Sequence, residues 1–537
     1  MSPLPIPWLE AALLLALAGA ASISWLRNLN RAWRWGVAFT GAVFVCTLAA
    51  SLGFYLQSPT EADADGSLQQ YLFGRPYLSL DKLNAPLVPA VALLHFLTAV
   101  ATSRTKMRSY SLTWSLTAEA IHLAKFACKE PGILVVLLAT GALLPLVELI
   151  NRRRPTRLYT LHWILFVGLL LAGWRLLVSA DGDALRTSAA TIALLAAVLI
   201  RCGVVPAHCW LTDWFEHSSF GIALLYVIPL SGVYAAIRLV LPIAPDWVLH
   251  SIGLFSLITA VYAAGMALVQ HEVRRFFAYL FLSHASLVLV GLELHTTVSL
   301  TGALALWFSI ILSLGGFGLV LRALEGRFGR LALRGHQGLY DHSPTLAVCF
   351  LLTGLASVGF PGTLGFVAAD MLVDGAVTVN LFAGMAVVAT AALNGIAIVR
   401  AYLLLFTGAR HTSTVSLAIG LRERIVVLTL AVLILGGGLF PQPGISSRHQ
   451  AAEEILKERQ SYFDARTKGR KHPLSASYAV TPNRIRCNKP SCADATCPQP
   501  VPFTQAAEQR LFFTENIFLE TLNPLDNTSR SPLNVRH

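Results

Sequence analysis

Residues 197–217 read AVLIRCGVVPAHCWLTDWFEH and place a glycine and a proline, Gly203 and Pro206, inside an apolar run of 186–215. Proline lacks a backbone N–H and clashes with the preceding turn, so a helix through this run is expected to break there. The stretch Gly359-Phe-Pro361-Gly362 interrupts a second apolar run, 345–372, in the same way. A break inside an apolar helix frees a carbonyl that needs another partner, often water or an ion. The alternative at each site is a simple proline kink.

The composition around these runs is that of a membrane protein. The 537 residues are 55% hydrophobic and 13% charged, whereas soluble domains carry about 25% charged residues. This excludes a soluble enzyme and a disordered or disulfide-stapled chain. The net charge of +12 does not indicate nucleic-acid binding, because the basic residues form short clusters between apolar blocks. No secretory signal is evident at the N-terminus.

The apolar residues fall into blocks of about 20, the length that crosses a bilayer as a helix. They predict an all-α polytopic membrane protein with about 14 transmembrane helices. The expected spans are 6–26, 34–56, 85–103, 112–128, 131–150, 159–178, 186–215, 219–241, 247–270, 276–293, 298–322, 345–372, 379–406 and 424–440.

The loops between these blocks alternate in charge. Loops that follow odd-numbered spans are basic, as in Arg152, Arg153 and Arg154 after the fifth, and the intervening loops are neutral or acidic. Basic loops face the cytoplasm in membrane proteins, so this alternation predicts the orientation. We expect the chain to reside in the cell's inner (plasma) membrane.

The two interrupted spans lie five spans apart and therefore run in opposite directions. This predicts two inverted five-helix repeats, 111–241 and 247–406, with broken helices seven and twelve, an architecture found in ion transporters. Residues 1–110 then hold three further spans, and 424–440 form the last.

The polar tail, 442–537, is expected to be an extramembrane extension that packs on the core or on a partner, with a helix only at 450–463. Its cysteines, Cys487, Cys492 and Cys497, match neither the zinc nor the ferredoxin spacing, so no metal site is predicted. A disulfide is favoured if the tail lies outside the membrane.

Four stretches carry a resemblance to a known family. They are 197–217, the segment from Gln270 to His284, Gly359–Phe366, and Gly232-Val-Tyr234 with Arg238. Together they resemble the antiporter-like membrane subunits of respiratory complex I, of multisubunit cation/proton antiporters and of membrane-bound hydrogenases. The resemblance covers about residues 80–440 and implies a proton-translocating fold with broken helices.

The chain departs from the family pattern in its seventh, eighth and eleventh spans. Arg201 stands where the family has a lysine, and an arginine is essentially never deprotonated. It can bias a neighbouring acid but cannot relay a proton by losing one. The segment Leu224–Leu230 and the position near Leu314 are apolar where the family has lysine or histidine. The proton relay is therefore expected to contain fewer titratable residues than that of the family.

The family's acids have two counterparts here. Glu148 represents the acid of the fifth span, although it lies further along the chain, beside Arg152. The alternative is an interfacial acid paired with Arg152. Asp370, after the Pro361 break, represents the acid or lysine of the twelfth span.

Other ionisable residues inside the spans are candidates because such groups are costly in a membrane. Glu119, His122 and Lys125 repeat at i, i+3 and share one helix face. They form either a charged path near the bundle axis or the polar face of a surface helix. Arg201 and His208 flank the Pro206 break. His284 can carry protons, or it is a hydrogen-bonded packing residue.

We found no motif for a chemical active site and expect no cofactor, so chemistry would reside in a partner. The resemblance implies a proton- or cation-translocating subunit of a larger energy-coupled complex with other membrane subunits and a soluble catalytic subunit, such as an NADH-quinone-oxidoreductase-like complex. One alternative is the membrane subunit of a bicarbonate/CO₂ uptake complex with a zinc carbonic-anhydrase-like partner. Others are a structural membrane anchor that has lost its relay and a self-sufficient transporter.

Overall fold

The computed structural model describes residues 7–56, 77–102, 107, 110–180, 183–294, 296–408 and 420–467. This part of the chain is helical and forms no strand. The first half contains α1 (Trp8–Ser24), α2 (Leu29–Leu56), α4 (Leu87–Val100), α5 (Leu112–Ala127), α6 (Pro131–Gly141), α7 (Leu143–Asn151), α8 (Arg157–Val178), α9 (Ala184–Cys202), α10 (Cys209–His217), α11 (Phe220–Val227), α12 (Ser231–Ala235) and the π-helix η2 (Ala236–Val240). The second half contains α13 (Asp246–Val269), α14 (Val273–Glu293), α15 (Thr297–Phe328), α16 (Pro344–Ser357), α17 (Leu364–Val379), α18 (Leu381–Phe406), α19 (Leu421–Leu439) and α20 (Gln442–Thr467).

The chain is a multi-pass membrane protein. Nine segments of the described chain are helical, long and apolar enough to cross a bilayer, or ten if α19 and α20, bent by 76°, count as one. Three shorter apolar helices, α1, α4 and α16, accompany them. The helices follow the predicted ranges closely because blocks of apolar residues separated by charged loops fix both helix length and position.

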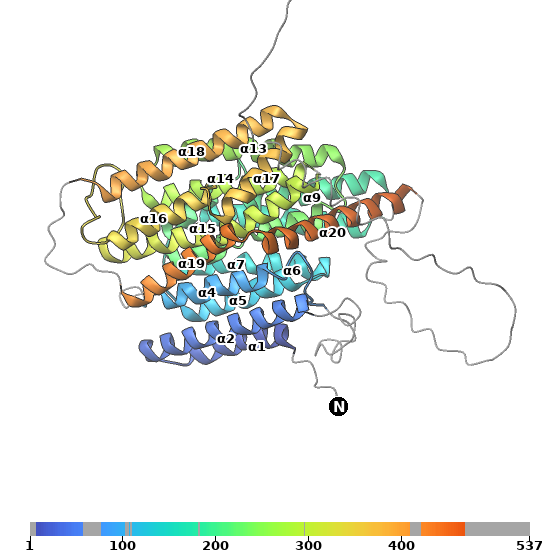
Figure 1. The fold of residues 1–537 in the computed structure, drawn as a ribbon. Helices are drawn as coiled ribbons and strands as arrows, with labels where there is room; N and C mark the ends of the chain where they lie inside the picture. Colours follow the sequence, from blue (N-terminus) through green and yellow to red (C-terminus); the bar gives the residue numbers. More distant parts are fainter. Residues whose placement is uncertain are drawn as a thin grey trace, which may run out of the picture. The chain divides into compact units, whose positions relative to one another are not determined.

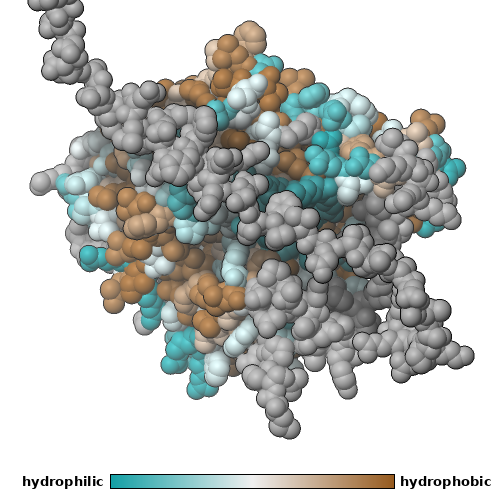
Figure 2. Space-filling model, turned by 45° about the vertical axis from the view of Figure 1, so that its right-hand side comes forward, coloured by the Kyte–Doolittle hydropathy of each residue, from teal (hydrophilic) through white to brown (hydrophobic). Residues whose placement is uncertain are grey.

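The centre of the bundle is formed by three segments. In Phe220–Val240, α14 and α15, 94% of the most apolar window is buried, against 22% in α8 and 33% in α18. Figure 1 shows α1 and α2 on one side of the bundle and α18 on the opposite side. The peripheral helices expose large apolar side chains, such as Leu161 on α8 and Ile396 on α18. Apolar residues are likewise spread over the face in Figure 2, as expected of a surface in contact with lipid.

Both predicted helix breaks are present. The first lies between α9 and α10, where Gly203 adopts φ 75°, and the second lies between α16 and α17, where Gly359 and Gly362 adopt φ 86° and 83°. Glycine takes these left-handed conformations without steric cost, so the glycines permit the sharp turns that Pro206 and Pro361 enforce.

A third break was not predicted. The expected span 219–241 is divided at Pro229, after which Leu230 adopts φ 53° and the chain continues as α12 and η2. Proline cannot continue the hydrogen bonding of α11. The segment is uniformly hydrophobic, so its hydropathy gave no indication that the backbone changes direction at this point.

The tail helix is longer than the predicted 450–463. α20 begins at Gln442 and packs on α15. Its polar first turns are fixed by buried Arg448, which donates to the carbonyl oxygens of Leu83 at 2.9 Å and Lys82 at 2.6 Å. Hydropathy alone could not reveal this anchor. Cys487, Cys492 and Cys497 lie outside the described residues.

Candidate functional site

The most concentrated group of buried ionisable side chains lies on α5. Ser111 caps this helix by accepting from the backbone N–H of Trp114, and Glu119, His122 and Lys125 follow on one face. Their relative exposures are 0%, 1% and 2%. These values contradict the alternative of an amphipathic surface helix.

Lys125 reaches from α5 to the unpredicted third break. Its Nζ donates to Ser231 Oγ at 2.9 Å, one residue after Leu230. Gly141 leaves room for the ammonium, because a Cβ there would lie 3.3 Å from Nζ. The lysine therefore lies beside the discontinuous segment Phe220–Val240, although its own helix is continuous.

The other two members of the row differ in their partners. His122 Nδ1 lies 3.5 Å from His95 Nε2 on α4, a pairing that the sequence analysis missed because His95 is a lone histidine in an apolar span. Both carboxyl oxygens of Glu119 are buried and have no hydrogen-bond partner among the described residues. A buried carboxyl without a partner is costly in its charged form, so Glu119 must be neutral or be reached by water.

Arg201 lies at the end of α9, before the first break. Its guanidinium carbon is 4.4 Å from the ring centroid of Tyr226 and 5.6 Å from that of Trp210. Trp210 is fixed in turn by a 2.9 Å hydrogen bond to the Ile200 carbonyl. Cation–π contacts thus hold the buried charge, and no carboxylate of the described chain pairs with it.

His208 lies on the other side of this break and is half-buried. Its ring packs against Tyr262 and Tyr279, with centroids 5.4 and 6.1 Å away. Nδ1 is buried without a hydrogen-bond partner in the described structure. Arg201 and His208 thus flank the break, as predicted, in two separate aromatic surroundings.

Glu148 forms the ion pair with Arg152 that the sequence analysis gave as its alternative reading. The carboxyl is 7% exposed and lies on α7. An i, i+4 pair next to a basic loop accounts for the burial of this acid without a transport role.

His284 is the central polar residue of the second half. Nδ1 lies 2.8 Å from the Leu280 carbonyl oxygen, and Nε2 lies 3.0 Å from that of Ser357. Ser357 is the last residue of α16, so the imidazole contacts the carbonyl end of the second broken helix. The imidazole donates a hydrogen bond to both carbonyl oxygens only when both of its ring nitrogens carry a proton.

Another buried polar contact in this half escaped the sequence analysis. Asn394 on α18 donates to Ser283 Oγ at 2.9 Å, and Ser283 donates to the Ala260 carbonyl at 2.9 Å. Asn394 Oδ1 has no partner among the described residues. The sequence signal for this contact was Asn394 itself, a polar residue in the middle of the apolar span 379–406.

Asp370 lies apart from these groups. It is exposed on α17, as is Asp374 one turn later. The apolar positions between the two halves are packed, because Leu224 and Leu314 are both 0% exposed. The structure therefore brings the α5 row and Arg201 into one half and His284 into the other, with an apolar interval between them.

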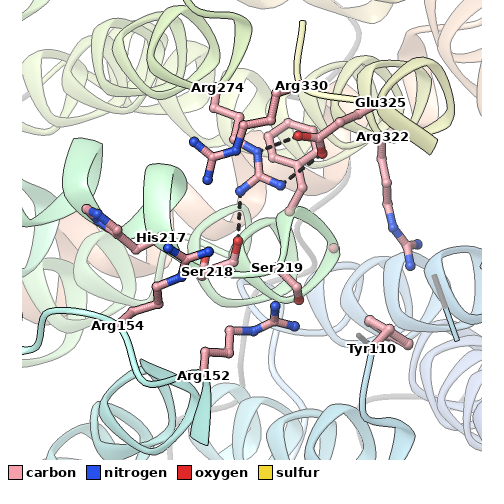
Figure 3. Close-up of a pocket in the computed structure, with 12 residues that line it drawn as sticks. Tyr110, Arg152, Arg154, His217, Ser218, Ser219, Arg274, Arg322, Glu325 and Arg330 are labelled. Carbon is pink, nitrogen blue, oxygen red and sulfur yellow. Dashed lines mark hydrogen bonds and ion pairs between the residues drawn. The ribbon is translucent and has the colours of Figure 1, made fainter. Parts of the chain in front are cut away.

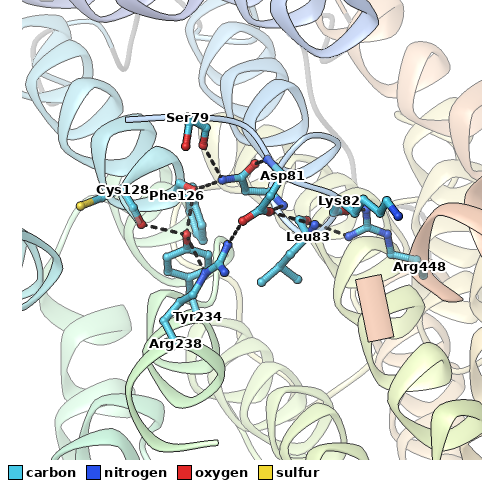
Figure 4. Close-up of polar contacts among 10 residues, drawn as sticks. Ser79, Asp81, Lys82, Leu83, Phe126, Cys128, Tyr234, Arg238 and Arg448 are labelled. Carbon is cyan, nitrogen blue, oxygen red and sulfur yellow. Dashed lines mark hydrogen bonds and ion pairs between the residues drawn. The ribbon is translucent and has the colours of Figure 1, made fainter. Parts of the chain in front are cut away.

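Asp81, Arg238 and Tyr234 form a separate polar cluster before α4 (Figure 4). Arg238 pairs with Asp81 and donates to Tyr234 Oη at 3.2 Å, and Tyr234 donates to the Phe126 carbonyl at 2.9 Å. Burial alone would raise the pKa of the Asp81 carboxyl, but the charges of Arg238 and Lys129 lower it below its ordinary value. This cluster joins the loop before α4 to α5 and η2, a structural role.

The comparisons with known proteins agree with this architecture. Residues 165–394 match the family model described as NADH:quinone oxidoreductase/Mrp antiporter, TM. NADH-quinone oxidoreductase subunit M of Rickettsia bellii is 26% identical over 275 residues, which cover 49% of this chain and 55% of the relative. The chain is thus similar to the antiporter-like membrane subunits, with the match to the family model confined to residues 165–394.

Solved structures of two membrane complexes contain chains with the same fold. A chain of respiratory complex I from Thermus thermophilus has a TM-score of 0.72 at 22% identity, covering 84% of this chain and 99% of that one. A chain of the Mrp complex from Dietzia sp. has a TM-score of 0.68 at 18% identity, with coverages of 84% and 96%. This chain spans about half the length of the curated relatives that it matches.

Proposed function

We propose that this protein moves protons, or Na⁺, across the inner membrane as a subunit of a larger energy-coupled complex. The observation that carries the proposal is the fully buried row Glu119, His122 and Lys125 beside a discontinuous helix. Ionisable groups buried in a membrane bundle mark ion pathways more often than structural contacts. The row also lacks the carboxylate–cation pairs that would neutralise it as a purely structural element.

The row gives each residue a distinct role. Glu119 binds and releases the proton, and His122 with His95 carries it along the helix face. Lys125, beside Ser231, responds to the charge of Arg201, which stays positive and biases its neighbours electrostatically. Glu148 is the proposed entry acid that Arg152 holds. Water must carry the ion across the apolar interval toward His284.

The breaks are proposed to supply the polar backbone at mid-membrane. Gly203 and Pro206 open the first helix, and Gly359 and Pro361 open the second, beside His284. We infer that α5, α19 and the three shorter apolar helices also cross, which together with the nine longer segments gives 14 spans with inverted repeats 111–241 and 247–406. Residues 1–110 and 424–440 flank the repeats, and 442–537 extend outside the membrane.

The partners are inferred from the relatives. The structural neighbours are chains of multisubunit assemblies, respiratory complex I and the Mrp complex. We propose that this chain likewise binds other membrane subunits, and a soluble catalytic subunit that supplies the energy. Asp370 has a place in this proposal at a subunit contact, because an exposed carboxylate within a span needs a polar neighbour.

The test is proton uptake by proteoliposomes that contain the complex purified in mild detergent. Lys125→Gln is expected to lower the uptake rate by roughly tenfold or more, since it removes the only buried ammonium of the described row. Lys457→Gln is the matched control, because the side chain of Lys457 on α20 is 74% exposed, and it should keep the wild-type uptake rate. Normal uptake in Lys125→Gln, with intact assembly, would refute the proposed path.

A structural anchor without a relay is the second candidate. The packed Leu224 and Leu314 favour it, because they leave no polar side chain between the two halves. An anchor would assemble and work normally with Lys125→Gln. The inorganic-carbon alternative remains a prediction, and co-purification of a zinc protein rather than redox subunits would support it.

A further inference from the structure

Five arginines surround one pocket at the basic ends of the spans (Figure 3). The cavity has a volume of about 220 Å³. The arginines are Arg152, Arg154, Arg274, Arg322 and Arg330. They come from the end of α7, the start of α14 and the end of α15, so segments far apart in the sequence converge on this space. By loop charge, this end of the bundle is the one expected to face the cytoplasm.

Two of the five charges are neutralised. Arg152 pairs with Glu148, and Arg274 forms a two-pronged pair with Glu325, at 2.7 and 2.9 Å. Arg274 also donates to the Ser218 carbonyl at 2.8 Å. These contacts hold Arg152 and Arg274 in the wall of the pocket. The positive charge that is not neutralised by an ion pair therefore comes from the other three arginines.

The remaining three form no ion pair with a carboxylate among the described residues, although Glu325 and Glu423 lie near enough to Arg322 to act on its charge. Arg330 donates to the backbone carbonyl of Glu216 at 2.9 Å, and the exposed side chain of Arg154 forms no hydrogen bond or ion pair within the described part of the chain. Arg322 is 7% exposed and donates to the Thr98 carbonyl and Thr102 Oγ. A guanidinium has five N–H donors, so Arg322 retains donors beyond these two.

The pocket is also lined by a buried serine hydroxyl that forms no hydrogen bond within the described chain. Ser218 is 2% exposed, and its Oγ has no hydrogen-bond partner in the described chain. The next residue, Ser219, caps α11, whose N-terminal end brings partial positive charge to the same wall. A buried donor beside unpaired guanidinium groups is the arrangement that binds an oxyanion.

We propose that this pocket binds a phosphate group, with Arg154, Arg322 and Arg330 neutralising it and Ser218 donating to one of its oxygens. Three guanidinium groups favour a phosphate anion, which they bind through paired hydrogen bonds. The phosphate belongs either to an anionic phospholipid or to a soluble phosphate compound. None of these four residues belongs to the α5 row, and the pocket shares only Arg152 with the proposed ion path, through its pair with Glu148.

The test uses the full chain in its purified complex, delipidated in detergent. The melting temperature is measured against inorganic phosphate at ionic strength held constant with chloride, and against phosphatidylglycerol with phosphatidylcholine as the zwitterionic control. Stabilisation by phosphate assigns a soluble ligand, and stabilisation by phosphatidylglycerol alone assigns a lipid headgroup. Native mass spectrometry before delipidation checks whether a phospholipid is retained.

The double variant Arg154→Gln/Arg330→Gln should weaken the effective ligand by roughly tenfold or more. Both side chains are exposed, so the fold should survive the change. Arg157→Gln, an exposed arginine of α8 outside the pocket, is the matched control and should bind normally. If neither phosphate nor phosphatidylglycerol stabilises beyond its control, or the double variant binds like the wild type, the inference is overturned.

Discussion

Replacing Asp81 by asparagine should destabilise the protein by about 3 kcal/mol, because it leaves Arg238 charged and unpaired. Asparagine keeps an oxygen for the backbone N–H groups of Leu83 and Asn84, which donate to the carboxylate at 3.0 and 2.9 Å. The lost contact is thus the ion pair alone. Breaking a buried pair costs about 3–5 kcal/mol, and side-chain exposures of 16% and 19% place this pair at the lower end.

The assay is equilibrium unfolding of the purified protein in mixed detergent micelles, with Arg238→Met and the double variant completing the cycle. The pair Lys82–Glu454 is the control, because its side chains are 39% and 48% exposed. Lys82→Gln should therefore cost less than about 1 kcal/mol. A loss below about 1 kcal/mol in Asp81→Asn, or strictly additive single variants, would refute the reasoning.

Three further predictions follow from the packing and charge of the same region. Because the pKa of Asp81 is lowered in the folded state, the ionised carboxylate stabilises the protein fully above the unfolded-state pKa of about 4, and this stabilisation is lost as the pH falls through the pKa of the folded state. Asp81→Asn should therefore flatten the dependence of the unfolding free energy on acid pH. Gly232→Ala places a Cβ 2.5 Å from Cys202 Sγ and should cost about 1–3 kcal/mol, whereas Gly265→Ala, with open space around it, should be neutral when melting temperatures are compared. Arg448→Met should release the start of α20, detected as faster protease cleavage there, and unchanged cleavage would contradict the anchoring role.

Hydropathy and loop charge predicted the helical fold and the positions of the helices, because both depend on short-range sequence properties. The glycine–proline pairs predicted the breaks at Gly203 and Gly359 for the same reason. The break at Pro229 was missed, since the surrounding residues are uniformly apolar and only their packing reveals the turn. The start of α20 was missed because Arg448, a polar residue, anchors it through distant carbonyls.

The candidate site was predicted unevenly. Spacing on α5 grouped Glu119, His122 and Lys125, but only the structure decides that this face is buried. The contact from Lys125 to Ser231 joins residues 106 positions apart, which one sequence cannot reveal. Asp370 was chosen because it follows Pro361, but distance from a break says nothing about the side of the helix, and its side chain is exposed.

The most direct test of the ion-path proposal is proton uptake by proteoliposomes containing Glu119→Gln, measured with a pH-sensitive dye. The substitution preserves shape and removes the titratable group, so we expect uptake to fall by roughly tenfold or more while the complex assembles normally. Asp374→Asn, an exposed acid of α17, is the control and should keep the wild-type rate. Wild-type uptake by Glu119→Gln in a fully assembled complex would contradict the proposal that the buried row carries the ion.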